Sequence, residues 1–330
     1  MSIIAAELVW RKPTEVSDAG TNGGRMTHLP ITSGVKNNIF PDVPQSERTA
    51  GSTKYRKVFI HVANDADLTL VAPKVFVESR TPGDDNVTFF VGTQRNQQSA
   101  LTDSEQRYGA GQLNGNVSPS GTVITVAVED AALDFLKSGM KVRISDKASI
   151  NGSGNEEYVT ITGAPGYVGN VATCNLTTGL VNGYSASTTK VASVYEPGDI
   201  APVIANWTEN GTGTYNEATY PVLGDNIATI EQDWTITFTS ATAFNISGDV
   251  LGMIGTGNVG SDAAPSNPNY SKPYFTLRSA GWGGTWASPN TITFRTSPAA
   301  IPLWYRRVVP AGANSLSGNS VIVAVDGESA

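Results

Sequence analysis

Glycines with the spacing of a dinucleotide-binding loop occur in residues 255–260, which read GTGNVG. Such a loop binds a pyrophosphate when a strand precedes it and a helix follows, because the helix N-terminus supplies amide groups and a dipole. The segment that follows cannot form a helix, since it contains Pro265, Pro268 and Pro273. The acid expected about twenty positions further on is missing, because none lies between Asp262 and Asp326. The sequence predicts a flexible glycine-rich turn leading into an exposed loop, without a nucleotide or other cofactor.

Side chains that could act as acids, bases or metal ligands are few. The two histidines, His28 and His61, belong to no His-x-x-x-His pair, and no Gly-x-Ser-x-Gly segment is present. The adjacent acids at 84–85 and 156–157 would point to opposite faces of a strand, so neither pair converges. A surface calcium site in residues 145–157 (SDKASINGSGNEE) is an alternative, although the spacing differs from that of an EF-hand. We therefore predict that the chain is not an enzyme and has no catalytic or metal-binding residues.

Two aromatic segments could bind partners. GWGGTW (281–286) sets Trp282 and Trp286 among glycines, and exposed tryptophans can stack on sugar rings; packing in a core or a subunit contact is the interpretation that we favour. LWYRRVV (303–309) combines residue types that are enriched at protein–protein hot spots, namely Trp304, Tyr305, Arg306 and Arg307. We expect these four side chains to make assembly contacts, and a phosphate contact by the arginines is the alternative.

Composition and charge narrow the class of protein. Only 15% of the 330 residues are charged, and glycine is abundant with 34 residues, which favours many short strands joined by turns over long helices. The net charge of −7 argues against stable binding of nucleic acid. No segment approaches the ~20 apolar residues of a membrane span, and the N-terminal residues do not resemble a signal peptide. We expect no contact with a membrane.

Patterns along the chain predict a mainly β fold in three parts. Residues 1–53 are expected to form an extended N-terminal arm, in which residues 2–10 could be one short strand. Residues 11–53 show little periodicity but contain apolar anchors, among them Met26, Leu29, Ile39 and Phe40, so we expect the arm to contact either a neighbouring subunit or its own body. Residues 54–115 and 197–330 alternate apolar and polar side chains, which indicates an antiparallel β-sandwich body. Residues 116–196 read as an inserted small β module, like a barrel, in which Cys174 is a buried thiol.

Several segments resemble virion structural proteins of tailed phages and prophages of proteobacteria. The resemblance lies in ITSGVKNNIFPDVPQSERTAGSTKYRKVFIHVANDADLTL (31–70) and TPGDDNVTFFVGT (81–93), and residues 121–163 look like the β-rich insertions of such proteins. It covers roughly half of the chain and brings no catalytic residues.

This resemblance implies a structural subunit of the virion, assembled in the bacterial cytoplasm, in a ring of identical copies associated with the tail tube or baseplate. Its partners would be further copies of itself and other tail proteins. A carbohydrate- or receptor-binding module at the tail tip, using Trp282 and Trp286, is one alternative. A capsid decoration protein is another.

Overall fold

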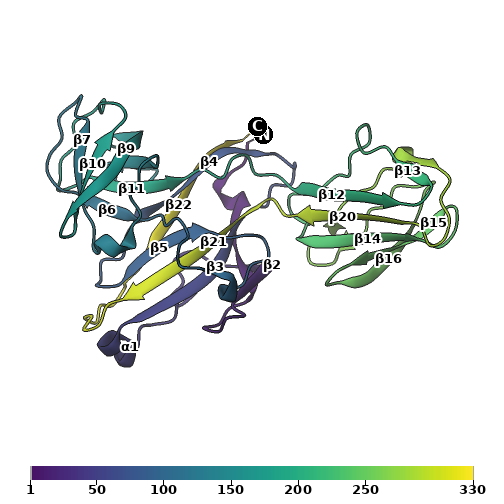
Figure 1. The fold of residues 1–330 in the computed structure, drawn as a ribbon, viewed down its shortest axis with the longest axis horizontal. Helices are drawn as coiled ribbons and strands as arrows, with labels where there is room; N and C mark the ends of the chain where they lie inside the picture. Colours follow the sequence, from purple (N-terminus) through teal and green to yellow (C-terminus); the bar gives the residue numbers. More distant parts are fainter. Residues whose placement is uncertain (1, 330) are drawn as a thin grey trace.

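The computed structural model describes residues 2–329 and confirms a mainly β protein built from antiparallel sheets. Figure 1 shows three modules in a row: a small barrel, a central body and a distal domain that projects to the right. Each module has its own cluster of buried hydrophobic side chains. Among the described residues, no helix is long and apolar enough to cross a membrane.

The central body is a sandwich whose first sheet has the strand order β2-β1-β3-β21-β5. Its strands are β1 (Leu8–Glu15), β2 (Gly23–Pro30), β3 (Ser52–Val62), β5 (Asn86–Val91) and β21 (Ala300–Val309). The facing layer contains β4 (Leu70–Ser79) and β22 (Ile322–Ser329). Val58, Val77 and Leu303 belong to the core that lies between the two layers. The helical segments of this body are one turn or slightly more: η1 (Ala5–Glu7), α1 (Gln45–Ala50) and η2 (Gln98–Ala100).

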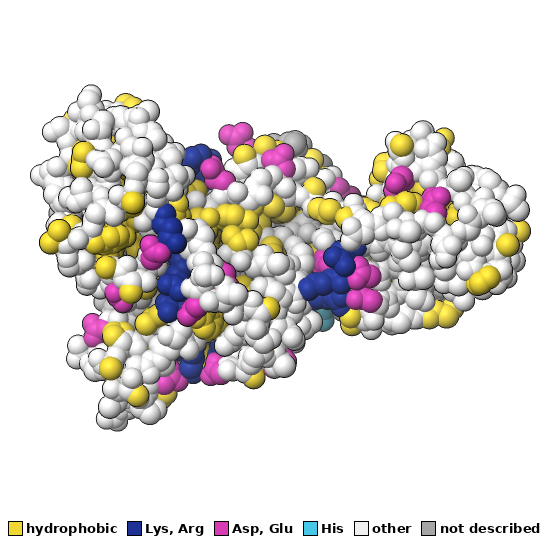
Figure 2. All heavy atoms as spheres, in the orientation of Figure 1, with side chains coloured by type: hydrophobic (Ala, Val, Ile, Leu, Met, Phe, Trp, Pro, Cys, Tyr) yellow, Lys and Arg dark blue, Asp and Glu magenta, His cyan; other side chains and the backbone are white. Residues whose placement is uncertain are grey.

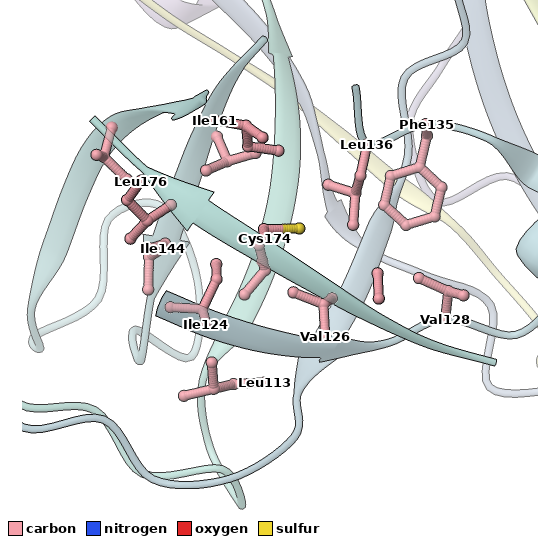
Figure 3. Packing of buried hydrophobic residues seen from close by; sticks show 14 of the residues in the cluster. Leu113, Ile124, Val126, Val128, Phe135, Leu136, Ile144, Ile161, Cys174 and Leu176 are labelled. Atoms are coloured by element: carbon pink, nitrogen blue, oxygen red, sulfur yellow. The ribbon is translucent and has the colours of Figure 1, made fainter. Parts of the chain in front are cut away.

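The barrel has the strand order β11-β6-β7-β10-β9-β8 and is closed by pairing of β8 with β11. Its elements are β6 (Ala110–Leu113), β7 (Val123–Ala127), η3 (Ala131–Leu133), β8 (Lys141–Ser145), β9 (Glu156–Val168), β10 (Val171–Leu176) and β11 (Lys190–Tyr195). Figure 3 shows Cys174 inside this barrel among Ile124, Ile161 and Leu136, and the predicted buried thiol is confirmed. Because β11 also pairs with β4 through Val194 and Tyr195, the barrel shares a strand with the central body.

The distal domain is a five-stranded sheet with the order β12-β20-β14-β15-β16, covered on one face by loops. Its main strands are β12 (Val203–Asn210), β14 (Gln232–Phe238), β15 (Ala243–Gly248), β16 (Gly252–Asn258) and β20 (Thr291–Ser297). Short elements hold the covering loops: β13 (Gly213–Tyr215), β17 (Ser266–Asn267), β18 (Lys272–Pro273), η4 (Ser279–Gly281) and β19 (Trp282–Gly284). Trp234, Ile236 and Phe238 of β14 are buried and alternate with half-buried residues, as the sequence pattern predicts.

The structure divides the chain differently from the predicted domains. β1 pairs with β3 and with β2, so much of the expected arm belongs to the central sheet, and residues 31–44 are its longest stretch without a strand or helix. The expected single sandwich is two modules, because residues 203–297 enclose a separate core before the chain returns to the central body as β21 and β22. The barrel begins with β6, before residue 116. Alternation predicts strands but not their partners, which explains these differences.

Candidate functional site

The distal domain is joined to the central body by charged side chains. Arg95, in the loop after β5, donates to Glu231 Oε1 at 2.5 Å and to Asp233 Oδ2 at 2.6 Å. Asp233 also accepts hydrogen bonds from Arg295 of β20 at 2.7 and 3.2 Å. Figure 2 shows side chains of both signs gathered at the narrow connection between the two modules. We call the group formed by Arg95, Glu231, Asp233 and Arg295 the distal junction.

Burial and hydrogen bonding keep this junction ionic. The Glu231 side chain is only 3% exposed, so its charge is compensated by arginine and not by water. Hydrogen bonds from Arg295 and Arg95 lower the pKa of Asp233 to about 2, which keeps this carboxylate ionised at neutral pH. At its edge, Arg25 of β2 forms a further ion pair with Asp249, which also accepts a hydrogen bond from Gln232.

A buried histidine makes a second contact between the same two modules. His61 Nε2 donates to the Asn226 carbonyl oxygen at 2.7 Å, and Arg11 Nε donates to His61 Nδ1 at 3.3 Å. One nitrogen donates and the other accepts, so the imidazole is neutral. Burial, assisted by the nearby Arg11, lowers the pKa of His61 to about 4, although the hydrogen bond to Asn226 acts in the opposite direction. The Asn226 amide donates in turn to Asp67 Oδ1 at 2.7 Å, which anchors the 225–231 segment on the central body.

The barrel is fixed to the central body by a buried ion pair. Arg143 Nη1 of β8 lies 2.7 Å from Glu78 Oε2 of β4, and their side chains are 1% and 4% exposed. Arg143 also contacts Glu156 at 3.1 Å and lies over the ring of Phe76 at 4.5 Å. Burial alone would raise the pKa of Glu156, but hydrogen bonds from Arg143, Tyr158 and Lys147 lower it to about 2. We call this group the barrel junction.

The sequence interpretation missed both junctions, although the sequence contained a signal for the barrel junction. Arg143 lies between Val142 and Ile144 in KVRIS, and Glu78 directly follows the apolar run VFV, in a chain with few charges. A charge inside an apolar strand indicates a buried partner, since an uncompensated buried charge is costly. The sequence could not identify the partner, because Glu78 is 65 residues from Arg143. The ion pairs of the distal junction and the barrel junction hold the three modules together in a fixed geometry.

The predicted hot-spot residues of β21 are buried in the central sheet. Trp304, Tyr305 and Arg307 are 0%, 3% and 5% exposed, because β21 lies between β3 and β5. Arg307 donates to the Pro41 carbonyl oxygen at 2.8 Å, and Arg306 is partly buried. The expectation that these residues make surface assembly contacts is therefore wrong. Their side chains stabilise the central body instead.

The apolar anchors of the expected arm lie in different environments, some against the core and one at the surface. Ile39 and Phe40 pack against the central core, and the Phe40 ring lies under the guanidinium groups of Arg307 at 4.7 Å and Arg56 at 5.7 Å. They fasten residues 31–44 to their own body. On β2, Met26 is half-buried whereas Leu29 is 48% exposed, so Leu29 lies at the surface.

The two tryptophans of the glycan hypothesis lie in the aromatic core of the distal domain. Trp286 is 3% exposed and stacks on Phe238 with 4.2 Å between ring centroids and 2° between planes. Trp282 is partly buried and packs edge-on against Phe238 at 5.7 Å. Stacking on a sugar requires an open ring face, which Trp286 does not have. These residues therefore pack in a core, and the alternative expectation that they form a glycan-binding surface is wrong.

The GTGNVG segment is not the turn that the sequence predicts, because its first residues belong to β16. Gly257 pairs with Phe244 of β15, and a Cβ atom at position 257 would lie 2.2 Å from the Phe244 ring. In the 145–157 segment, Asp146 accepts a hydrogen bond from the Asn155 amide at 2.6 Å. Across residues 2–329, no group of three or more His, Cys, Asp or Glu is arranged to hold a metal ion.

A hollow of about 400 Å³ lies where the N-terminal residues, β22 and the barrel meet. Its apolar lining includes Ile3, Leu70 and Val325, and its polar lining includes Lys147 and Glu156, which pair with each other at 3.0 Å. The hollow thus adjoins the barrel junction, and Lys147 and Glu156 are part of that ion-pair network.

We found no protein family, curated protein or solved structure that matches this chain. The functional conclusion therefore depends on the geometry described above and on the sequence resemblance.

Proposed function

We propose that this chain is a structural subunit of a tailed-phage virion, in or next to the tail tube or baseplate, that acts by oligomeric assembly. One observation carries the proposal: buried charged groups at two junctions tie three β modules into one elongated body. A subunit built in this way maintains a fixed spacing between the contacts at its two ends. A particle that assembles once and then resists shear needs such spacers.

Further features support an assembly role. The segments 31–70 and 81–93 resemble virion proteins. Open strand edges remain at β2, β12, β16 and β22, and such edges present backbone groups to which a neighbouring chain can add. Exposed apolar side chains also occur at the two ends of the row, for instance Val168 in the barrel and Val250 in the distal domain.

The direct test is the composition of the particle. Virions induced from the host that carries the gene would be purified and analysed by mass spectrometry, and gold-labelled antibody would locate the chain. We expect the chain in stoichiometric amounts with label on the tail. Label on the head would identify a decoration protein, and label at the tail tip, together with glycan binding, would favour the receptor alternative. Absence from purified particles would refute the proposal.

The role of rigidity can be tested with a matched pair of variants. Arg95→Ala removes the central arginine of the distal junction, whereas Lys36→Ala removes one partner of an ion pair whose side chains are 79% and 64% exposed. We expect Arg95→Ala to lower the yield of complete particles and Lys36→Ala to leave it unchanged, since exposed pairs contribute little. Equal yields for both variants would show that the junction does not matter for assembly.

A further inference from the structure

The strand β16 presents an open edge without any charged residue. Among residues 2–329 its only partner is β15, and it forms the outer margin of the distal sheet in Figure 1. No Asp, Glu, Lys or Arg occurs between Asp249 and Asp262. Natural sheets usually protect an open edge with charges or prolines, because unpaired backbone groups are a template for another strand. An unprotected edge therefore indicates pairing with a further chain.

Other margin strands are protected by charges or by a further backbone contact. β5 has no charged residue, but its Phe89 exchanges backbone hydrogen bonds with Tyr108. β2 contains Arg25, β12 contains Glu209, and β22 contains Asp326 and Glu328. β16 therefore differs from the other margin strands in having neither kind of protection. The contrast includes β12, which forms the opposite margin of the same sheet.

A glycine of β16 has no explanation inside the monomer. The fold explains Gly257, because a Cβ atom there would collide with Phe244. At Gly255, in contrast, a Cβ atom would meet no heavy atom within 4 Å, and its φ is not in the left-handed region. A glycine within a strand costs up to about 1 kcal/mol relative to alanine. Such a glycine often marks the close approach of another backbone.

Exposed apolar side chains surround this glycine. Val250, Leu251 and Met253 are 66%, 40% and 60% exposed, and all three lie at the start of β16 or in the turn before it. A partner strand along β16 would cover them, and burial of apolar surface would then favour association.

We propose that β16 pairs antiparallel with β16 of a second copy about a two-fold axis near Gly255, so that two five-stranded sheets become one continuous sheet. A second copy fits this edge because the strand is complementary to itself. Pairing centred on Gly255 places Met253 of one chain opposite Gly257 of the other, a large side chain beside a small one. The strand also lacks the charge that would select a charged partner. The contact is isologous, joining the same surface of both copies, and it does not rest on the proposed function.

The test compares one substitution at the two edges of the same sheet. Thr256→Lys adds a charge on β16, and Thr208→Lys adds the same charge at an exposed position of β12. The full chain would be measured by analytical ultracentrifugation from about 1 to 100 µM. We expect dimers for the native chain and for Thr208→Lys, and a dissociation constant raised at least ~10-fold for Thr256→Lys. Circular dichroism would verify that each variant is folded.

A second variant separates association from stability. Gly255→Val has open space for its side chain within the monomer and a residue type that favours strands, so the melting temperature of the monomer should stay equal or rise. The same side chain should obstruct the approach of a second strand and weaken the dimer. A monomeric native chain over this range, or equal weakening by Thr256→Lys and Thr208→Lys, would overturn the proposal. A Gly255→Val dimer as tight as the native one would do so too.

Discussion

Acidification should loosen the contact between the central body and the distal domain at His61. The side chain is fully buried, and its neutral form donates to Asn226 while accepting from Arg11. Burial lowers the pKa of His61 from 6.5 to about 4, so between these values the unfolded chain binds a proton that the folded chain does not. Above about pH 6.5 this histidine does not reduce the free energy of unfolding. As the pH falls from 6.5 toward 4, the free energy of unfolding decreases, because protonation favours the unfolded chain. Asp225 and Arg11 are the charged groups that act on it.

The magnitude follows from the interval between the two pKa values. Each pH unit corresponds to about 1.4 kcal/mol per proton, so the interval from 6.5 to about 4 corresponds to about 3 kcal/mol. Below the lower value, a protonated imidazole would lose the hydrogen bond from Arg11 and lie beside its positive charge. The Asn226 segment should then detach before the rest of the molecule unfolds.

The assay compares the native chain with His61→Gln, whose amide can make both hydrogen bonds without titrating. Hydrogen exchange of residues 225–231 and urea unfolding would be followed from pH 7 to pH 4. We expect the native chain to lose about 3 kcal/mol more than His61→Gln over this range, which isolates the histidine from the carboxylates that titrate in both proteins. Parallel pH profiles for the two proteins would refute the reasoning.

Three further predictions concern the central body, the barrel junction and β16. Burial lowers the pKa of Lys57 from 10.5 to about 7, so the native chain should gain stability as the pH rises from 7 toward 10, at up to about 1.4 kcal/mol per pH unit. Urea midpoints of Lys57→Met should lack this slope. Arg143→Met should cost about 3–5 kcal/mol in urea unfolding because Glu78 stays buried without its main partner. The double variant with Glu78→Met should recover most of that loss, and a double variant as unstable as the single one would contradict this account. Gly257→Val should destabilise the distal domain by more than about 1 kcal/mol, because its Cβ would lie 2.2 Å from Phe244. Thermal unfolding should show no such loss for Gly255→Val, and equal losses would mean that Phe244 is not the cause.

Much of the secondary structure follows from the sequence, because a half-buried strand alternates apolar and polar residues. The alternation of Trp234, Ile236 and Phe238 identifies β14, and the apolar surroundings of Cys174 identify a buried barrel strand. The aromatic cluster around Trp286 was open to two interpretations on sequence alone, since a glycine-rich loop with tryptophans can either cover a core or present rings to a ligand. The covering loops of the distal domain decide for the core.

Tertiary structure alone decided the partners of each strand and each charge. β21 comes from the end of the chain yet lies between β3 and β5, which buries Trp304 and Arg307 although their types are common at protein surfaces that bind partners. Glu78 meets Arg143 across two modules for the same reason. Side-chain alternation shows which face of a strand is apolar. It does not identify the adjoining strand, because every residue except proline offers the same backbone donor and acceptor. The sequence by itself thus determined the mainly β class and many of the strands, and the packing of distant segments determined which residues became core, junction or open edge.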